Sequence, residues 1–139
     1  MFIPITVKTL VPVTPELAWE VFTSPQHIVN WCFASPDWHA PTAANDLQPG
    51  GRFTTRMEAK DGSLGFDFEG IYQEVIPHQL IKYLMANGRM VEITFTEQDG
   101  ATLVTETFDA EEENSLELQE QGWQAILNNY NQYAASLAN

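Results

Sequence analysis

Three turn signals divide the middle of this chain into a series of strands. Asp61-Gly62, Asn87-Gly88 and Asp99-Gly100 each stand between runs in which apolar and polar side chains alternate. Such dipeptides supply the positive backbone dihedral angles of a two-residue hairpin turn, and alternation is the period of a half-buried strand. A fourth reversal is expected at Pro77-His78. We therefore predict an antiparallel meander with strands at residues 52–60, 64–76, 80–86, 90–97 and 102–108.

The residues before the meander predict one strand followed by two short helices. Residues 3–11 alternate apolar and polar side chains, which is typical of a half-buried strand. Thr14-Pro15 and Ser24-Pro25 each offer a hydroxyl N-cap with proline at the first helical position. We expect the two helices at about residues 15–22 and 25–31, and a weak strand at 39–45.

After the meander the apolar residues recur at intervals of three and four, which predicts a long amphipathic helix. Asn114 is the expected N-cap, with Glu117 as its capping-box partner. A sheet followed by a helix indicates the α+β class, and 139 residues is the size of one domain. The apolar positions of the helix are Leu116, Trp123, Ile126, Leu127, Tyr130, Ala134 and Leu137.

Several spaced residues resemble one known superfamily. They are Trp19, Trp31, the segment Asp-Leu-Gln-Pro-Gly-Gly-Arg-Phe at 46–53, Gly70 with the segment 74–77, and Gly122-Trp123. Together they resemble the START-related helix-grip (SRPBCC) superfamily, in the branch similar to the activator of the heat-shock protein 90 ATPase. The resemblance implies one helix-grip domain over residues 1–139. In that fold an antiparallel sheet of about six to seven strands wraps around a long C-terminal helix, with two short helices after the first strand and a cavity between sheet and helix.

Function is less constrained than fold, because this superfamily includes lipid carriers, cyclases, hormone receptors and chaperone activators. The leading expectation is that the cavity binds a small hydrophobic or aromatic molecule. The alternative is that the same side chains simply fill a core. The expected lining residues are Trp31, Phe33, Trp38, Phe53, Met57, Phe66, Phe68, Tyr72, Tyr83, Met85, Phe95, Trp123, Leu127 and Tyr130.

A cyclase- or hydrolase-type enzyme is another option, and it would need a polar residue in the cavity. Glu106 is a buried carboxyl if it shares the inward face of its strand, and a solvated one if Leu103 faces inward. The solvated arrangement is the one we expect. Asp37 and His39 are weaker candidates for an acid–base pair at the cavity mouth, although ordinary surface groups are expected there too.

The sequence predicts no metal site and no cofactor. His27, His39 and His78 lack the spacing of metal ligands, and no phosphate-binding loop or dinucleotide fingerprint is present. Cys32 is the only cysteine, which excludes an intramolecular disulfide and fits a reducing compartment. We read Cys32 as a core residue rather than a nucleophile, and we expect a cytoplasmic location.

Charge narrows the choice of partners. The chain has 19 carboxylates against 6 bases, a net charge of −13, and no Lys or Arg follows Arg89. Nucleic acids and anionic membrane surfaces would be repelled, so neither is expected as a partner. The acids at 111–113 either start the last helix or bind a chaperone or another basic protein. Self-association into a homodimer is a further option.

Overall fold

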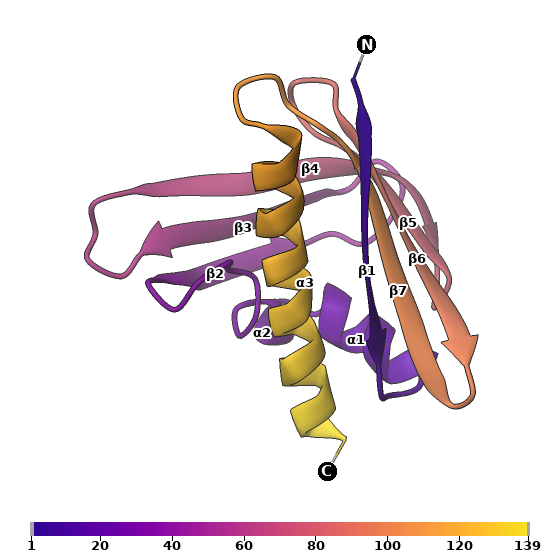
Figure 1. Cartoon of the computed structure of the whole chain (residues 1–139). Helices are drawn as coiled ribbons and strands as arrows, with labels where there is room; N and C mark the ends of the chain where they lie inside the picture. The colour runs from indigo at the N-terminus through magenta and orange to yellow at the C-terminus, as the bar shows by residue number, and fades with distance from the viewer. Residues whose placement is uncertain (1, 139) are drawn as a thin grey trace.

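The computed structural model describes residues 2–138, and its centre is one antiparallel sheet of seven strands. The sheet curls around the long helix α3, which crosses its concave face (Figure 1). The spatial order of the strands is β1-β7-β6-β5-β4-β3-β2. This arrangement confirms the predicted helix-grip α+β fold. The elements are β1 Pro4–Val11, α1 Pro15–Thr23, α2 Pro25–Ile28, β2 Trp38–Asn45, β3 Arg52–Ala59, β4 Gly65–Ile76, β5 Leu80–Leu84, β6 Met90–Gln98, β7 Ala101–Asp109 and α3 Leu116–Leu137.

The hairpins form where the turn signals predict them, but only one uses two positive dihedral angles. Asp99 and Gly100 have φ of 52° and 85° between β6 and β7, as a two-residue turn of this kind requires. In the other two turns the glycine alone has positive φ. Asp61 and Asn87 instead accept hydrogen bonds from the backbone N–H two residues further on, at 2.8 and 3.2 Å. Because the side chain of Asp61 or Asn87 closes each turn with a hydrogen bond, these two turns form without a second residue of positive φ.

Two helix boundaries differ from the prediction. Helix α2 ends at Ile28 rather than near Trp31, whose indole N–H donates to the carbonyl of Val21 at 3.0 Å. The cap of α3 is Ser115, whose hydroxyl accepts from the N–H of Leu118 at 3.1 Å. Asn114 is not the cap, because its backbone and side-chain N–H groups both donate to the carboxylate of the preceding acidic turn. Adjacent Asn and Ser are both good caps, so sequence alone could not choose between them.

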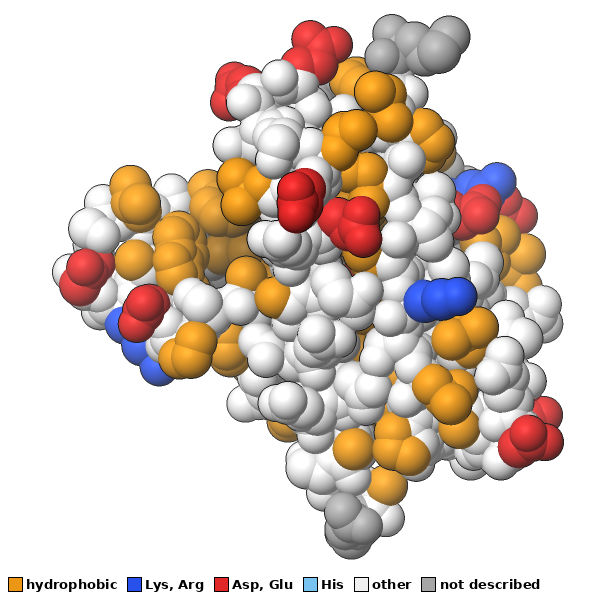
Figure 2. All heavy atoms as spheres, viewed as in Figure 1, with side chains coloured by type: hydrophobic (Ala, Val, Ile, Leu, Met, Phe, Trp, Pro, Cys, Tyr) orange, Lys and Arg blue, Asp and Glu red, His pale blue; other side chains and the backbone are white. Residues whose placement is uncertain are grey.

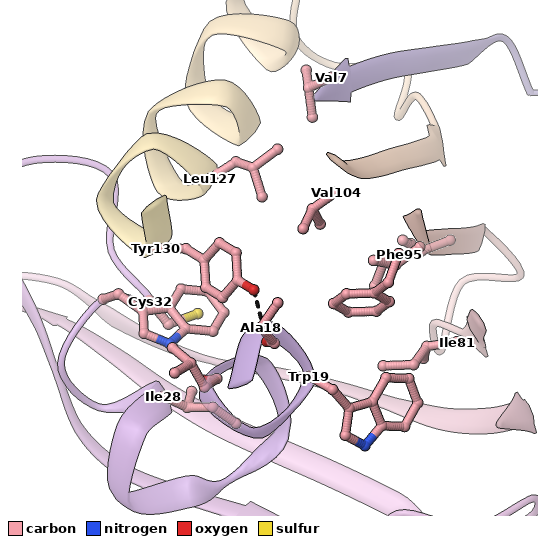
Figure 3. Close-up of a cluster of buried hydrophobic side chains, with 14 of the residues drawn as sticks. Val7, Ala18, Trp19, Ile28, Cys32, Ile81, Phe95, Val104, Leu127 and Tyr130 are labelled. Carbon is pink, nitrogen blue, oxygen red and sulfur yellow. Dashed lines mark hydrogen bonds between the residues drawn. The ribbon is translucent and has the colours of Figure 1, made fainter. Parts of the chain in front are cut away.

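The core lies at the end of the sheet where the C-terminal half of α3 meets α1. Leu127, Tyr130 and Ala134 are 1%, 0% and 0% exposed. The hydroxyl of Tyr130 points to α1 and donates to the carbonyl of Ala18 at 2.7 Å (Figure 3). Along the same helix, the side chain of Asn131 donates to the backbone carbonyl of Leu10 at 3.1 Å. This end of the molecule is therefore closed and α3 is fixed to β1.

Candidate ligand-binding cavity

A cavity of about 340 Å³ lies between the N-terminal half of α3 and the concave face of the sheet. Its wall is mostly apolar, and hydrophobic side chains gather around the hollow between α3 and the projecting end of β3 and β4 (Figure 2). Strand alternation places these side chains inside, because every second residue of β3, β4, β5 and β6 points to the concave face. The sheet curls and α1 fills only the opposite end, so space remains beneath the start of α3.

Many of the side chains predicted to line a cavity lie on this wall. They come from both sides of the space. One side is formed by strands β3, β4 and β5, the turn after α2 and the turn after β5, and the other by α3. Contact with a ligand stays a prediction for each of them. The nine residues are Trp31, Phe53, Met57, Phe66, Phe68, Tyr72, Tyr83, Met85 and Trp123.

The other five predicted residues lie elsewhere. Phe95, Leu127 and Tyr130 are buried in the closed core (Figure 3). Phe33 is half-buried against that core, and Trp38 lies beside one of the lining rings with 6.0 Å between ring centroids. Alternation and helical period show which side chains face inward, but they do not show how deep the filled core extends.

The wall also contains residues that were not among the predicted lining positions. Four of them could have been predicted from the sequence. Thr55, Ile81 and Ile93 share strand faces with predicted lining residues, and Ile126 lies on the apolar stripe of α3. Arg89, at the end of the β5–β6 turn, could not have been predicted in this way. The remaining additions are Phe22, Thr23, Ile28, Cys32, Ala44, Glu106, Glu111, Asn114 and Gln119.

Glu106 corrects the prediction that its carboxyl is solvated. It is 7% exposed and lies on the inward face of β7 with Val104 and Phe108, whereas Leu103 is only half-buried. Strand β7 lies between β1 and β6, and its register sets Glu106 opposite the buried residues Val7 and Ile93. Burial raises the pKa of Glu106 from 4.5 to about 8, so the carboxyl is mostly protonated at neutral pH.

Asp37 and His39 do not form the predicted acid–base pair. The imidazole Nε2 of His39 lies 3.7 Å from the carboxylate of Glu58, on the outer face of the sheet. The backbone carbonyl of Asp37 accepts from the N–H of Lys60 at 2.8 Å. Neither residue lines the cavity. A reaction in the cavity would therefore depend on Glu106 without a second acid or base from this pair.

Two further polar residues stand on the cavity wall. Tyr83 is 5% exposed, and burial, followed by the nearby Glu106 carboxyl, raises the pKa of its hydroxyl well above the usual value. Arg89 donates from Nη1 to the carbonyl of Asp109 at 3.2 Å. Its Nε is buried and meets no acceptor among the described residues. These groups give the apolar cavity a small polar region.

Cys32 lies on the cavity wall and is buried. Burial, followed by the nearby Glu106 carboxyl, raises the pKa of its thiol to about 12. A thiol with so high a pKa is hardly ionised at neutral pH, which makes it a poor nucleophile. This agrees with reading Cys32 as a packing residue.

The remaining histidines serve in side-chain contacts. The Nδ1 of His27 is 2.8 Å from the hydroxyl of Tyr133, and the ring of His78 meets Trp19 edge-on at 5.9 Å. Within residues 2–138, no three His, Cys, Asp or Glu side chains are grouped so that they could hold a metal ion. The described helices include none that is both long and apolar enough to cross a membrane.

Comparison with known proteins places this geometry in context. Residues 12–135 match the family model described as Activator of Hsp90 ATPase homolog 1-like protein. The chain is similar to the solution structure of an AHSA1-like protein from Aeromonas hydrophila, with 38% identity, a TM-score of 0.92, and coverage of 98% of this chain and 94% of that one.

Two other solved structures share the fold. A protein from Cytophaga hutchinsonii is 48% identical over 96% of this chain and 93% of its own, with a TM-score of 0.82. A protein from Nitrosomonas europaea has a TM-score of 0.83 at 20% identity, over 97% and 96% of the two chains. At that identity the likeness concerns the fold alone. No curated protein matches the chain.

Proposed function

Because the chain belongs to the family of Activator of Hsp90 ATPase homolog 1-like proteins, whose helix-grip fold commonly binds ligands, we propose that it binds a small hydrophobic or aromatic molecule. The observation that carries this proposal is the cavity of about 340 Å³ with its aromatic wall. Protein interiors are close-packed, and voids larger than a water molecule are few. A space of this size falls in the range of small-molecule sites.

The wall suits a flat, apolar molecule because its rings pack edge to face and hold one another in place. Phe53 and Tyr83 have ring centroids 4.7 Å apart, and Phe68 and Trp123 have centroids 6.0 Å apart. Such pairs are favourable beyond the area they bury. The ligand would lie among ring faces and edges that change little when it enters.

Native mass spectrometry of gently purified protein is the first test. A discrete extra mass that disappears on denaturation is expected, and it would begin to identify the molecule. Where purification removes the ligand, the neutral fluorophore N-phenyl-1-naphthylamine serves as a probe, because its emission increases in apolar surroundings. Absence of both the extra mass and probe binding would contradict the proposal.

A cavity-filling variant locates the binding. Thr55 is 4% exposed and lies on the cavity wall, whereas the adjacent Thr54 points to the other face of the sheet. Thr55→Phe should weaken probe binding by at least about tenfold because the new ring occupies the space, and Thr54→Phe should leave it within about twofold. If Thr55→Phe destabilised the fold while probe affinity stayed unchanged, the wall residues would be ordinary core.

A second candidate function is binding to a chaperone or another basic protein surface. Glu112, Glu113, Glu117 and Glu120 are all exposed at or just before the start of α3. An acidic surface of this kind complements a basic one, and such binding weakens as salt rises. A pull-down with a chaperone middle domain at low and high salt tests it, and no binding at low salt would eliminate it.

We also propose that the protein is cytoplasmic. The support is its single cysteine, Cys32, which is free and buried and forms no disulfide. Cell fractionation with antibody detection tests this, and recovery in an extracellular fraction would contradict it.

A further inference from the structure

Three polar groups on the cavity wall lack a hydrogen-bond partner in the described chain. Other buried polar groups are paired: Thr102 donates to the carbonyl of Val13 at 2.8 Å, and on the cavity wall itself Tyr72 donates to the side chain of Asn45 at 2.7 Å. Among residues 2–138, no side chain or backbone group hydrogen-bonds the carboxyl of Glu106 or the hydroxyl of Tyr83. Buried polar groups in native structures are nearly always satisfied, so such exceptions require a reason.

Arg89 supplies the third unpaired group, and its Nε is the one side-chain N or O atom of the described residues that is both fully buried and without a partner. Its Nη1 is held by the carbonyl of Asp109, which fixes the position of the guanidinium, while the buried Nε has no acceptor within the described chain. Leaving a buried donor unpaired costs about 1 to 3 kcal/mol, and more when the group is charged. An acceptor supplied by a ligand would remove that cost.

All three groups act as donors at neutral pH. The Arg89 guanidinium offers only N–H donors, the Tyr83 hydroxyl keeps its proton, and the buried Glu106 carboxyl is mostly protonated as well. A cavity with three free donors and an apolar wall favours a ligand that presents acceptor oxygens. Because the donor at Arg89 carries a full charge, an anionic oxygen suits it best.

We propose that the molecule bound in the cavity is an acidic aromatic compound, whose carboxylate or other anionic group pairs with Arg89 while its rings lie among Phe53, Phe68 and Trp123. This inference rests on the proposed function, since it names the class of ligand for the same cavity. Further acceptor oxygens on the ligand would accept hydrogen bonds from the hydroxyl of Tyr83 and the protonated carboxyl of Glu106.

Two observations oppose an anionic ligand, but neither outweighs the contact that its anionic group would make with Arg89. The net charge of −13 repels anions at long range, but such repulsion is screened over about 8 Å at physiological salt. Glu111 is also on the cavity wall, but both of its carboxylate oxygens accept hydrogen bonds from Asn114. Arg89 is the only Lys or Arg among the lining residues.

A matched pair of fluorescent probes tests the inference. 1-Anilinonaphthalene-8-sulfonate and N-phenyl-1-naphthylamine share one ring skeleton, and only the first carries an anionic group. Both are titrated against the intact protein and against Arg89→Met and Arg89→Gln. The glutamine variant keeps a donor for the Asp109 carbonyl, so it preserves the fold if methionine does not. Arg52→Met removes the same charge from an exposed position and is the control.

Both Arg89 variants should weaken sulfonate binding by at least about tenfold and leave the neutral probe within about twofold, while Arg52→Met changes neither. Loss of both probes to the same extent in the folded glutamine variant would overturn the inference, since Arg89 would then only support the cavity. Unchanged sulfonate binding in these variants, or binding of the neutral probe alone to the unaltered protein, would overturn it too. If neither probe bound the unaltered protein, the proposed function itself would fail.

Discussion

The two halves of α3 face the same sheet but have different surroundings. In the C-terminal half, Leu127, Tyr130 and Ala134 are almost fully buried against β1 and α1 (Figure 3). In the described N-terminal half, Gln119 is the one buried residue, at 8% exposed, and a Cβ built on Gly122 would meet no atom within 4 Å. One half of the helix is packed and the other half covers a cavity.

The two halves also differ in that some polar groups around the cavity lack a partner. In the packed half, the hydroxyl of Tyr130 and the side chain of Asn131 both donate to backbone carbonyls, at 2.7 and 3.1 Å. Around the cavity, Glu106, Tyr83 and the Nε of Arg89 have no partner among the described residues. The packed half therefore satisfies the polar groups named here, whereas three groups on the cavity wall stay unpaired within the described chain, as the proposed ligand site would require.

Truncation in the packed half should have the largest effect. Tyr130→Ala removes a fully buried ring and its hydrogen bond, and should lower the free energy of unfolding by about 3 to 5 kcal/mol. Tyr130→Phe removes only the hydroxyl and should lower it by about 1 kcal/mol. Urea denaturation measures both. A loss below about 1 kcal/mol for the alanine variant would show that this half of α3 is not packed as described.

The buried carboxyl should make stability depend on pH. The pKa of Glu106 is raised from 4.5 to about 8 in the folded state, so from about pH 5 to 8 the folded protein keeps a proton that the unfolded chain releases. Stability therefore falls as pH rises through this window and levels off above it. Glu106→Gln has no titrating carboxyl at this position. The difference in the free energy of unfolding between this variant and the unaltered protein should therefore shift in favour of the variant by a few kcal/mol between about pH 5 and pH 9.

The groups around Glu106 do not reverse that sign. Burial, followed by the Glu106 carboxyl, raises the pKa values of Cys32, Tyr83 and Tyr130, so all three stay neutral through the window. Glu120→Gln, at an exposed position, is the matched control and should show no such pH dependence. Parallel stability curves for Glu106→Gln and the unaltered protein would contradict the burial of this carboxyl.

Truncation over the cavity should affect binding more than stability. Trp123 is half-buried and stacks on Phe108 with ring centroids 4.0 Å apart. Trp123→Ala should lower the affinity for N-phenyl-1-naphthylamine by at least about tenfold and the free energy of unfolding by only about 1 to 2 kcal/mol. Trp38→Ala, outside the cavity wall, should keep the probe affinity. Unchanged affinity together with a large loss of stability would make Trp123 a core residue.

The sequence predicts the sheet and the helix well because both have strong periods and clear boundaries. The alternating runs and the turn at Asp99-Gly100 correspond to observed strands and a hairpin. The inward face of β7 could not be decided from the sequence, because apolar residues lie on both faces, with Leu103 on one and Val104 and Phe108 on the other. The expectation that Glu106 is solvated was wrong. The structure instead buries the carboxyl, because Val104 and Phe108 on its face pack into the core.

The cavity is less predictable than the fold. The period of the apolar residues shows which side chains face inward, but it does not show whether they line a cavity or lie in the closed core. Phe53 and Phe95 both face inward by alternation, yet the first lines the cavity and the second lies in the closed core. What separates them is α1, whose Trp19 and Phe22 rings pack edge-on against Phe95 with centroids 5.2 and 5.6 Å apart. Arg89 could not be predicted at all, since its role depends on a guanidinium whose Nε finds no partner in the folded chain.

A glycine exchange gives the smallest expected effect and tests the difference between the two halves most directly. Gly122 lies within α3, where glycine costs about 1 kcal/mol relative to alanine, and no atom would crowd a new Cβ. Gly122→Ala should therefore raise the free energy of unfolding by up to about 1 kcal/mol. Ala134→Gly, in the packed half, should lower it by at least that much because it also removes a buried methyl group. Thermal denaturation measures both, and a destabilised Gly122→Ala would mean that α3 has close neighbours over the cavity and that its two halves are packed alike.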